Sequence, residues 1–316
     1  MENKEYNYRT DIAYDEIAKF NDDLLGIKTT IKNYGDIKVV KTKINKKHDK
    51  RIQKKSGLYY TIEFQDLNIH NNDSAEKIIQ VLAKVLVELL KTKKVLDKKG
   101  MLIGLGNINV TPDSIGPYTL DNVIVTRHLF VNDQNNIGYS NVSGYSPGVM
   151  GNTGIETADI INAIYSKVGA DFLIVVDALA TSSVSRINKT IQITDSGISP
   201  GSGVGNKRKE ISKETMGIPV IAVGIPTVVD AKTLTIDLIN KANEYLNGFD
   251  NSESKIRDIN TDELRNILDV ATRDSLYDMV VTPKEIDEVV EDISKILAAG
   301  IDIAIHKKLR ETYLKA

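Results

Sequence analysis

Short apolar runs alternate along this chain with longer segments whose apolar residues recur at helical spacing, and this alternation limits the fold more than any other feature. A buried strand of a parallel sheet reads as a continuous apolar run, whereas a helix that covers the sheet is apolar on one face only. The alternation predicts a single α/β domain with a mostly parallel central sheet and helices on both faces. The expected strands are residues 57–67, 100–106, 170–180 and 217–229, and the expected helices are residues 74–94, with Ser74 as its cap, 155–168, 231–246 and 283–309.

The composition of the 316 residues excludes several classes of protein. The absence of cysteine excludes disulfide bonds, thiolate-bound zinc, iron–sulfur clusters and a cysteine nucleophile, and it fits a cytoplasmic protein. No apolar run approaches the ~20 residues that span a bilayer, and the polar residues 1–16 lack the apolar core of a secretion signal. A net charge of −2 gives no electrostatic reason to expect nucleic-acid binding, and we expect the basic stretch 41–55 to be solvated surface.

Two aspartates stand near the ends of predicted strands. Asp113 follows the strand at 100–106 through a glycine-rich turn, and Asp177 comes after five consecutive apolar residues. Ligands of open α/β sheets bind beyond the carboxyl ends of the strands, so the two carboxyl groups could share one cleft. Such a pair holds one proton between its members. One carboxyl can then act as an acid while the other acts as a base that activates water against a peptide carbonyl.

Two other interpretations of these aspartates stay open at the level of residues. In the structural interpretation, which spacing alone favours, Asp177 caps a following helix and Asp113 closes a Thr-Pro-Asp turn. In the other, His128 joins the two aspartates in a metal site. No His-x-x-x-His motif supports a zincin.

The glycine-rich segments do not match nucleotide-binding motifs. The turn that begins at Gly104 lacks the third glycine of the dinucleotide fingerprint, and in residues 201–210 Asn206 interrupts the Gly-Lys pair of a P-loop. We expect a surface loop at 201–210, whose Lys207 and Arg208 could stabilise an oxyanion. Residues 148–157 form a glycine-rich entry to a helix, and their amides could bind a substrate carbonyl.

Several long motifs, taken in their order, resemble those of the germination protease family, the spore proteases of endospore-forming bacteria. The resemblance runs from Asp11 to about Ala231, and its length makes it far more specific than a single short motif. The motifs are RTDIA, GLGNINVTPDSIGP, VTRHLF, PGVMGNTGIETADII, VVDALA and TIQITDSGISPGSGVGNKRKEISKETMGIPVIAVGIPTVVDA.

This resemblance implies a fold like that of the hydrogenase-maturation endopeptidases, which is described as phosphorylase/hydrolase-like. It implies a cytoplasmic endopeptidase of the spore core that degrades small acid-soluble spore proteins early in germination. It also implies a zymogen that removes its own N-terminal segment and assembles as a homotetramer. No cofactor, membrane or direct nucleic-acid partner is implied.

The resemblance also assigns roles to residues. It implies an atypical aspartic peptidase whose catalytic pair is Asp113 and Asp177, with Gly106 and Asn107 in the supporting turn. The family cuts after an acidic residue and before small apolar residues. The expected self-cleavage therefore lies between Asp11 and Ile12, which divides the chain into a prosegment, 1–11, and a peptidase domain, 12–316. A role for Asp11 as the cap of a helix that follows it is compatible with this cut.

Overall fold

We describe the fold from a computed structural model, for residues 11–17, 24–65, 72–131, 138–201, 208–247 and 279–314. The strands of this part of the chain form one sheet in the order β1-β2-β3-β7-β8-β6-β4-β5, and β9 pairs with the far end of β8. Each strand that the sequence predicts is present. The bounds are β1 (Ile27–Tyr34), β2 (Ile37–Ile44), β3 (Gly57–Glu63), β4 (Gly100–Gly104), β5 (Val142–Tyr145), β6 (Phe172–Thr181), β7 (Thr190–Thr194), β8 (Val220–Asp230) and β9 (Val280–Val281).

The sheet is mixed, so the expectation of a mostly parallel sheet is wrong. In the described part of the chain, β5, β4, β6 and β8 pair in parallel, whereas β1, β2, β3, β7 and β9 add to the sheet in antiparallel pairs. The short turn between Tyr34 and Ile37 joins β1 to β2, and a connection of that length permits only antiparallel pairing. The basic stretch 41–55 is also only partly surface, since Thr42 and Ile44 of β2 are buried.

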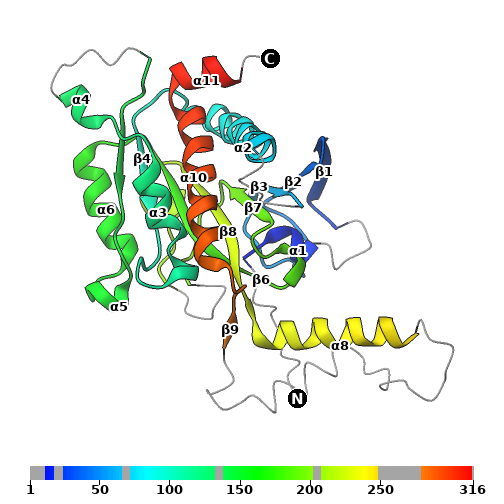
Figure 1. The fold of residues 1–316 in the computed structure, drawn as a ribbon. Helices are drawn as coiled ribbons and strands as arrows, with labels where there is room; N and C mark the ends of the chain where they lie inside the picture. The colour runs from blue at the N-terminus through cyan, green and yellow to red at the C-terminus, as the bar shows by residue number, and fades with distance from the viewer. Residues whose placement is uncertain are drawn as a thin grey trace.

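Helices cover both faces of the parallel half of the sheet, as predicted. On β4, Leu102 packs into the core that α2 and α10 contribute to, whereas Met101 and Ile103 pack on the opposite face with residues of α6. Figure 1 shows α2, α3 and α10 together on one face, with α6 apart from them. The helices are α1 (Ala13–Ile17), α2 (Asn72–Thr92), α3 (Ile115–Asn122), α4 (Arg127–Val131), α5 (Met150–Thr153), α6 (Thr157–Val168), α7 (Lys213–Met216), α8 (Ala231–Asn247), α10 (Ile286–Ile305) and α11 (Lys307–Tyr313), with 3₁₀ turns η1 (Thr111–Asp113) and η2 (Val184–Arg186).

Two helix predictions need correction. Helix α2 begins at Asn72, so Ser74 lies inside its first turn and is not the cap. The C-terminal segment forms two helices rather than one, because the chain is extended at His306. The His306 ring accepts a hydrogen bond from the Ser140 amide (3.2 Å) and contacts the Ile124 carbonyl (3.0 Å), which ties the break to two distant loops. None of the described helices combines the length and apolar character that crossing a membrane requires.

Asp302 of α10 carries a buried carboxyl group. Only 5% of its surface is exposed, and both of its oxygens accept from the Ile124 amide at 3.1 and 3.3 Å. Burial raises the pKa of Asp302 to about 7, and the Ile124 hydrogen bond opposes this rise only in part. The folded chain therefore binds a proton here over a pH range in which an unfolded aspartate has lost it.

We predict that Asp302→Asn weakens the pH dependence of stability. Because the folded state binds the extra proton, protonation of Asp302 adds to the free energy of unfolding. This contribution is fully present below about pH 4 and is lost as pH rises through about 7, and the whole loss is on the order of 4 kcal/mol. Asn keeps an acceptor for the Ile124 amide and carries no charge. Urea unfolding at pH 5 and pH 8 should show that the free energy of unfolding falls less between these pH values in the variant than in the wild type. Asp287→Asn, exposed on the same helix, should behave as wild type, and equal losses in all three proteins would contradict the prediction.

Candidate active site

The site lies where one strand of the sheet stops while its neighbours continue. Strand β4 ends at Gly104, opposite Val176 of β6, whereas β6 and β8 stay paired for several residues more. Asp177 is the first residue of β6 beyond the end of β4. The structural interpretation in which Asp177 caps a following helix is therefore wrong, since β6 continues as a strand to Thr181. The open edge beside Asp177 leaves room for the chain that leaves β4.

The turn after β4 brings Asp113 back to this edge. The Leu105 amide bonds to the Val176 carbonyl (2.8 Å), which holds the start of the turn against β6. At Gly106 the backbone has φ +108°, and a Cβ there would lie 1.9 Å from the Asp113 carbonyl oxygen. Only glycine fits this conformation and this approach. The Asn107 amide then donates to Oδ2 of Asp113 (2.8 Å), so the turn that contains Gly106 holds the Asp113 side chain.

Strand β8 supports the same turn from the other side. The Thr227 hydroxyl donates to the Pro112 carbonyl (2.7 Å), next to Asp113, and the Thr282 hydroxyl donates to the Thr227 carbonyl (2.8 Å). The Asp113 amide bonds to the Val110 carbonyl (2.8 Å), so Asp113 also closes a turn, as the structural interpretation expects. Sequence reasoning missed Thr227, because nothing in its local sequence shows that β8 reaches a turn more than a hundred residues earlier.

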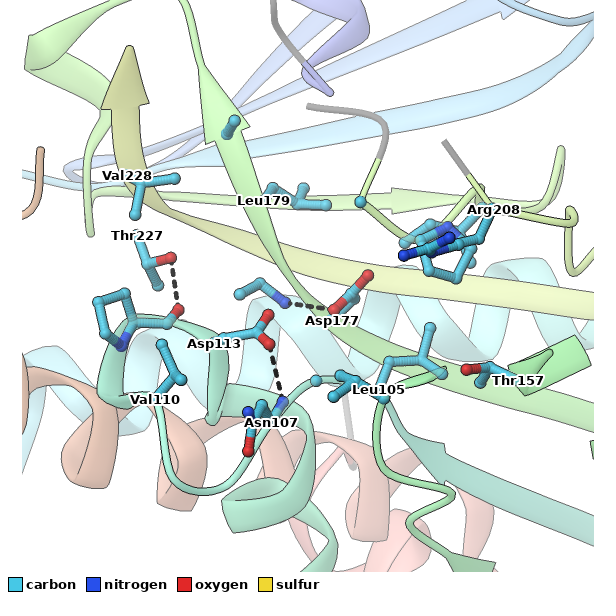
Figure 2. A pocket seen from close by; sticks show the side chains of 18 of the residues that line it. Leu105, Asn107, Val110, Asp113, Thr157, Asp177, Leu179, Arg208, Thr227 and Val228 are labelled. Carbon is cyan, nitrogen blue, oxygen red and sulfur yellow. Dashed lines mark hydrogen bonds between the residues drawn. The ribbon is translucent and has the colours of Figure 1, made fainter. Parts of the chain in front are cut away.

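The two aspartates open into one cavity of about 490 Å³. Figure 2 shows their carboxyl groups turned toward the same space, with Arg208 on the far side of Asp177. Glycine-rich residues from the entry to α6 line another wall. The lining comprises residues 105–107, 110, 112–113, 148–151, 157, 177–180, 198–201, 208, 227–228 and 280, together with Asp11.

Burial and mutual repulsion both favour protonation at this site. Burial raises the pKa of Asp177 well above its usual range, and the negative charges of Asp113 and Asp11 raise it further. Burial also raises the pKa of Asp113, and the Asn107 hydrogen bond limits that rise. Two buried carboxyls that repel each other share a proton, which is the arrangement that acid–base chemistry requires.

Asp11 enters this cavity from the N-terminal side. Its amide bonds to the Ala180 carbonyl (2.9 Å), and one oxygen of its side chain accepts from the Ala180 amide (2.9 Å). The next residues, Ile12 and Ala13, are fully buried, and α1 begins at Ala13. The bond that the sequence predicts to be cut therefore begins at a residue that lines the cavity of both aspartates.

The remaining predicted site residues fall in different places. Arg208 lines the cavity but contributes to neither aspartate's pKa shift, while Lys207 lies outside the described residues. His128 is exposed on α4 and is not among the lining residues, so the structure does not bring it to the aspartates. Within the described ranges, no group of three or more histidine, aspartate or glutamate side chains is placed to hold a metal ion.

Comparison with known proteins identifies the family. The family model described as germination protease matches residues 2–247. The chain belongs to the germination protease family. It is 40% identical to the germination protease of Bacillus velezensis over 96% of this chain and 94% of that protein, and 37% identical to the Clostridium tetani protein over 95% and 96%. The Bacillus subtilis germination protease is 36% identical over 97% and 95%.

A germination protease is a peptidase, so this chain is a hydrolase of peptide bonds. Among solved structures, a NiFe hydrogenase maturation protease from Thermococcus kodakarensis aligns with a TM-score of 0.29 and 18% identity, over 45% of this chain and 80% of that one. So low a score does not define the fold, which the sheet topology of this chain defines instead.

We predict that Gly106→Ala destabilises this chain and lowers its activity through the turn that carries Asp113. The substitution must relieve both an unfavourable φ and a 1.9 Å overlap with main chain, so we expect a loss of at least about 2 kcal/mol of unfolding free energy. We also expect proteolytic activity to fall at least about tenfold. Gly154→Ala is the matched control: its φ is +69° with no atom in the way, so it should lose only about 1 kcal/mol. Equal losses in urea unfolding would contradict the prediction.

Proposed function

We propose that the protein is an endopeptidase made as a zymogen, which uses Asp113 and Asp177 to cut its own chain between Asp11 and Ile12. The observation that carries this proposal is the shared cavity: Asp11 lies among the lining residues, close enough to Asp177 for its charge to raise the pKa of that carboxyl. The proposal requires that a water molecule held between the aspartates reach this bond.

In the proposed mechanism Asp113 is the base and Asp177 is the acid. Asp177 has the larger rise in pKa and accepts one main-chain hydrogen bond from Ala178, so it holds the shared proton. Ionised Asp113 takes a proton from water while the water oxygen bonds to the carbonyl carbon. Asp177 gives its proton to the amide nitrogen as the C–N bond breaks. The products are a carboxylic acid on Asp11, which then loses its proton to solvent, and a free amine on Ile12, with Asp113 protonated and Asp177 ionised.

We further propose that the processed enzyme acts on small acid-soluble spore proteins in the cytoplasm of the spore core. Membership of the germination protease family and the resemblance of the sequence motifs support this substrate class and location. A homotetramer and a prosegment of residues 1–11 rest on the same resemblance. Arg208, which lines the cavity without a side-chain partner among the described residues, is suited to a negatively charged group of the substrate.

We predict that Asp113→Asn and Asp177→Asn each abolish self-processing. Because Asn can neither hold nor accept the transferred proton, we expect rates to fall by roughly a thousandfold or more. Mass spectrometry of the purified full-length chain measures the loss of residues 1–11. Melting temperatures should stay at or above the wild-type value, since each variant removes a buried carboxyl. Asp159→Asn, exposed on α6, is the control and should process normally. Near-normal processing by either active-site variant would contradict the assignment.

The alternative function is a metallopeptidase in which His128 and an aspartate bind the metal. The exposed position of His128 on α4 does not support it. We predict that the metal-depleted protein still processes itself in the presence of a chelator. Loss of processing with chelator, and recovery with a divalent cation, would favour the metallopeptidase instead.

A further inference from the structure

Gln192 in the centre of β7 is a buried amide with an unusual pair of partners. Only 6% of its surface is exposed. Its Nε2 donates to the Asp11 carbonyl oxygen at 2.7 Å, and its Oε1 accepts from the Ala13 amide at 2.6 Å. The first partner is the carbonyl of the Asp11–Ile12 bond, and the second lies one residue beyond that bond. One side chain therefore spans the predicted cleavage site on both sides.

Sheet register places this amide beside the aspartates. Asp177 of β6 and Gln192 of β7 both pair with Gly224, from opposite sides of β8. Residues that pair directly across strands point to the same face, so the Asp177 carboxyl and the Gln192 amide share a face, with backbones about 10 Å apart. Gly224 between them adds no side chain of its own. No side chain therefore stands between the Asp177 carboxyl and the Gln192 amide in this line of paired residues across the sheet.

Ala180 and Gln192 together hold residues 11–13, mostly through the main-chain groups of Asp11 and Ala13. Ala180 exchanges bonds with the amide and the side chain of Asp11, while Gln192 holds the carbonyl of Asp11 and the amide of Ala13. A donor at one end and an acceptor at the other is a combination that a glutamine amide supplies and a carboxylate does not.

We propose that Gln192 positions the scissile bond for self-cleavage and donates to its carbonyl oxygen as negative charge develops there. This inference rests on the proposed self-processing at Asp11–Ile12. When water adds to the carbonyl carbon, charge accumulates on the oxygen that already accepts the Nε2 hydrogen. A donor preorganised on that oxygen stabilises the transition state more than the ground state.

Gln192→Glu in the full-length chain tests the proposal, because the variant is nearly isosteric and its hydrogen bonding depends on pH. An ionised Glu can accept from Ala13 but cannot donate to the Asp11 carbonyl, whereas a protonated Glu can do both. We expect self-processing about a hundredfold slower than wild type at pH 8. The deficit relative to wild type should shrink as pH falls toward 5. Intact-mass spectrometry gives the rates, and melting temperatures are recorded at each pH.

Thr194→Val is the matched control. Thr194 is buried two residues along β7 on the same face, and its hydroxyl bonds to Ser196 away from the cavity lining. It should process like wild type at every pH. Three results would overturn the positioning role of Gln192. The Gln192→Glu variant could process as fast as wild type at pH 8, its deficit in rate could stay constant with pH, or that deficit could follow the change in melting temperature.

The same experiment separates this inference from the proposed function. If wild type loses residues 1–11 and Asp177→Asn does not, self-processing stands, and the Gln192→Glu profile alone decides the role of Gln192. If wild type never cuts at Asp11–Ile12, both fail, because Gln192 then has no scissile bond to position.

Discussion

The site depends on a difference in strand length within the parallel half of the sheet. Strand β4 stops opposite Val176, and β6 continues beside β8 with one edge open. That edge lets the turn from β4 fold back, so that Asp113 arrives next to Asp177 without displacing any strand. The tight approach at Gly106, the support from Thr227 and the entry of Asp11 all follow from this open edge. Had β4 extended as far as β6, its backbone would occupy the place of the cavity.

Two buried carboxyls beside each other cost free energy, and the fold around them compensates for that cost only partly. Asp113 and Asp177 each accept a hydrogen bond from a main-chain amide, and burial still raises the pKa of both. The packed core on the two faces of the sheet supplies the rigidity that keeps them together. A protein that gained nothing from this pair would be more stable with apolar side chains there. The uncompensated repulsion is therefore itself an argument for function.

The sequence predicts the parts of this structure whose pattern is local. Continuous apolar runs predict β4, β6 and β8, and one-sided apolar spacing predicts α2 and α10. Strands β1 and β2 escape prediction, because β1 is exposed along nearly its whole length and lysines break the apolar pattern of both strands. The aspartate pair follows from the rule on strand ends, although Asp177 lies inside its strand. Gln192 could not be found in this way, because its role depends on register between strands and on a segment about 180 residues earlier.

Under the proposed self-processing, Asp11 would give the uncut chain a different electrostatic state from the cut one. Its negative charge is one of three causes that raise the pKa of Asp177, together with burial and Asp113. The uncut chain therefore favours the protonated acid that the proposed mechanism needs for cleavage. Departure of the prosegment would remove that charge, so Asp177 would lose its proton at lower pH in the processed enzyme than in the precursor. If the substrate also carries an acid before its scissile bond, as the resemblance implies, that residue would restore the charge on entering the cavity. The acid before the proposed scissile bond would then help to prepare the catalytic pair.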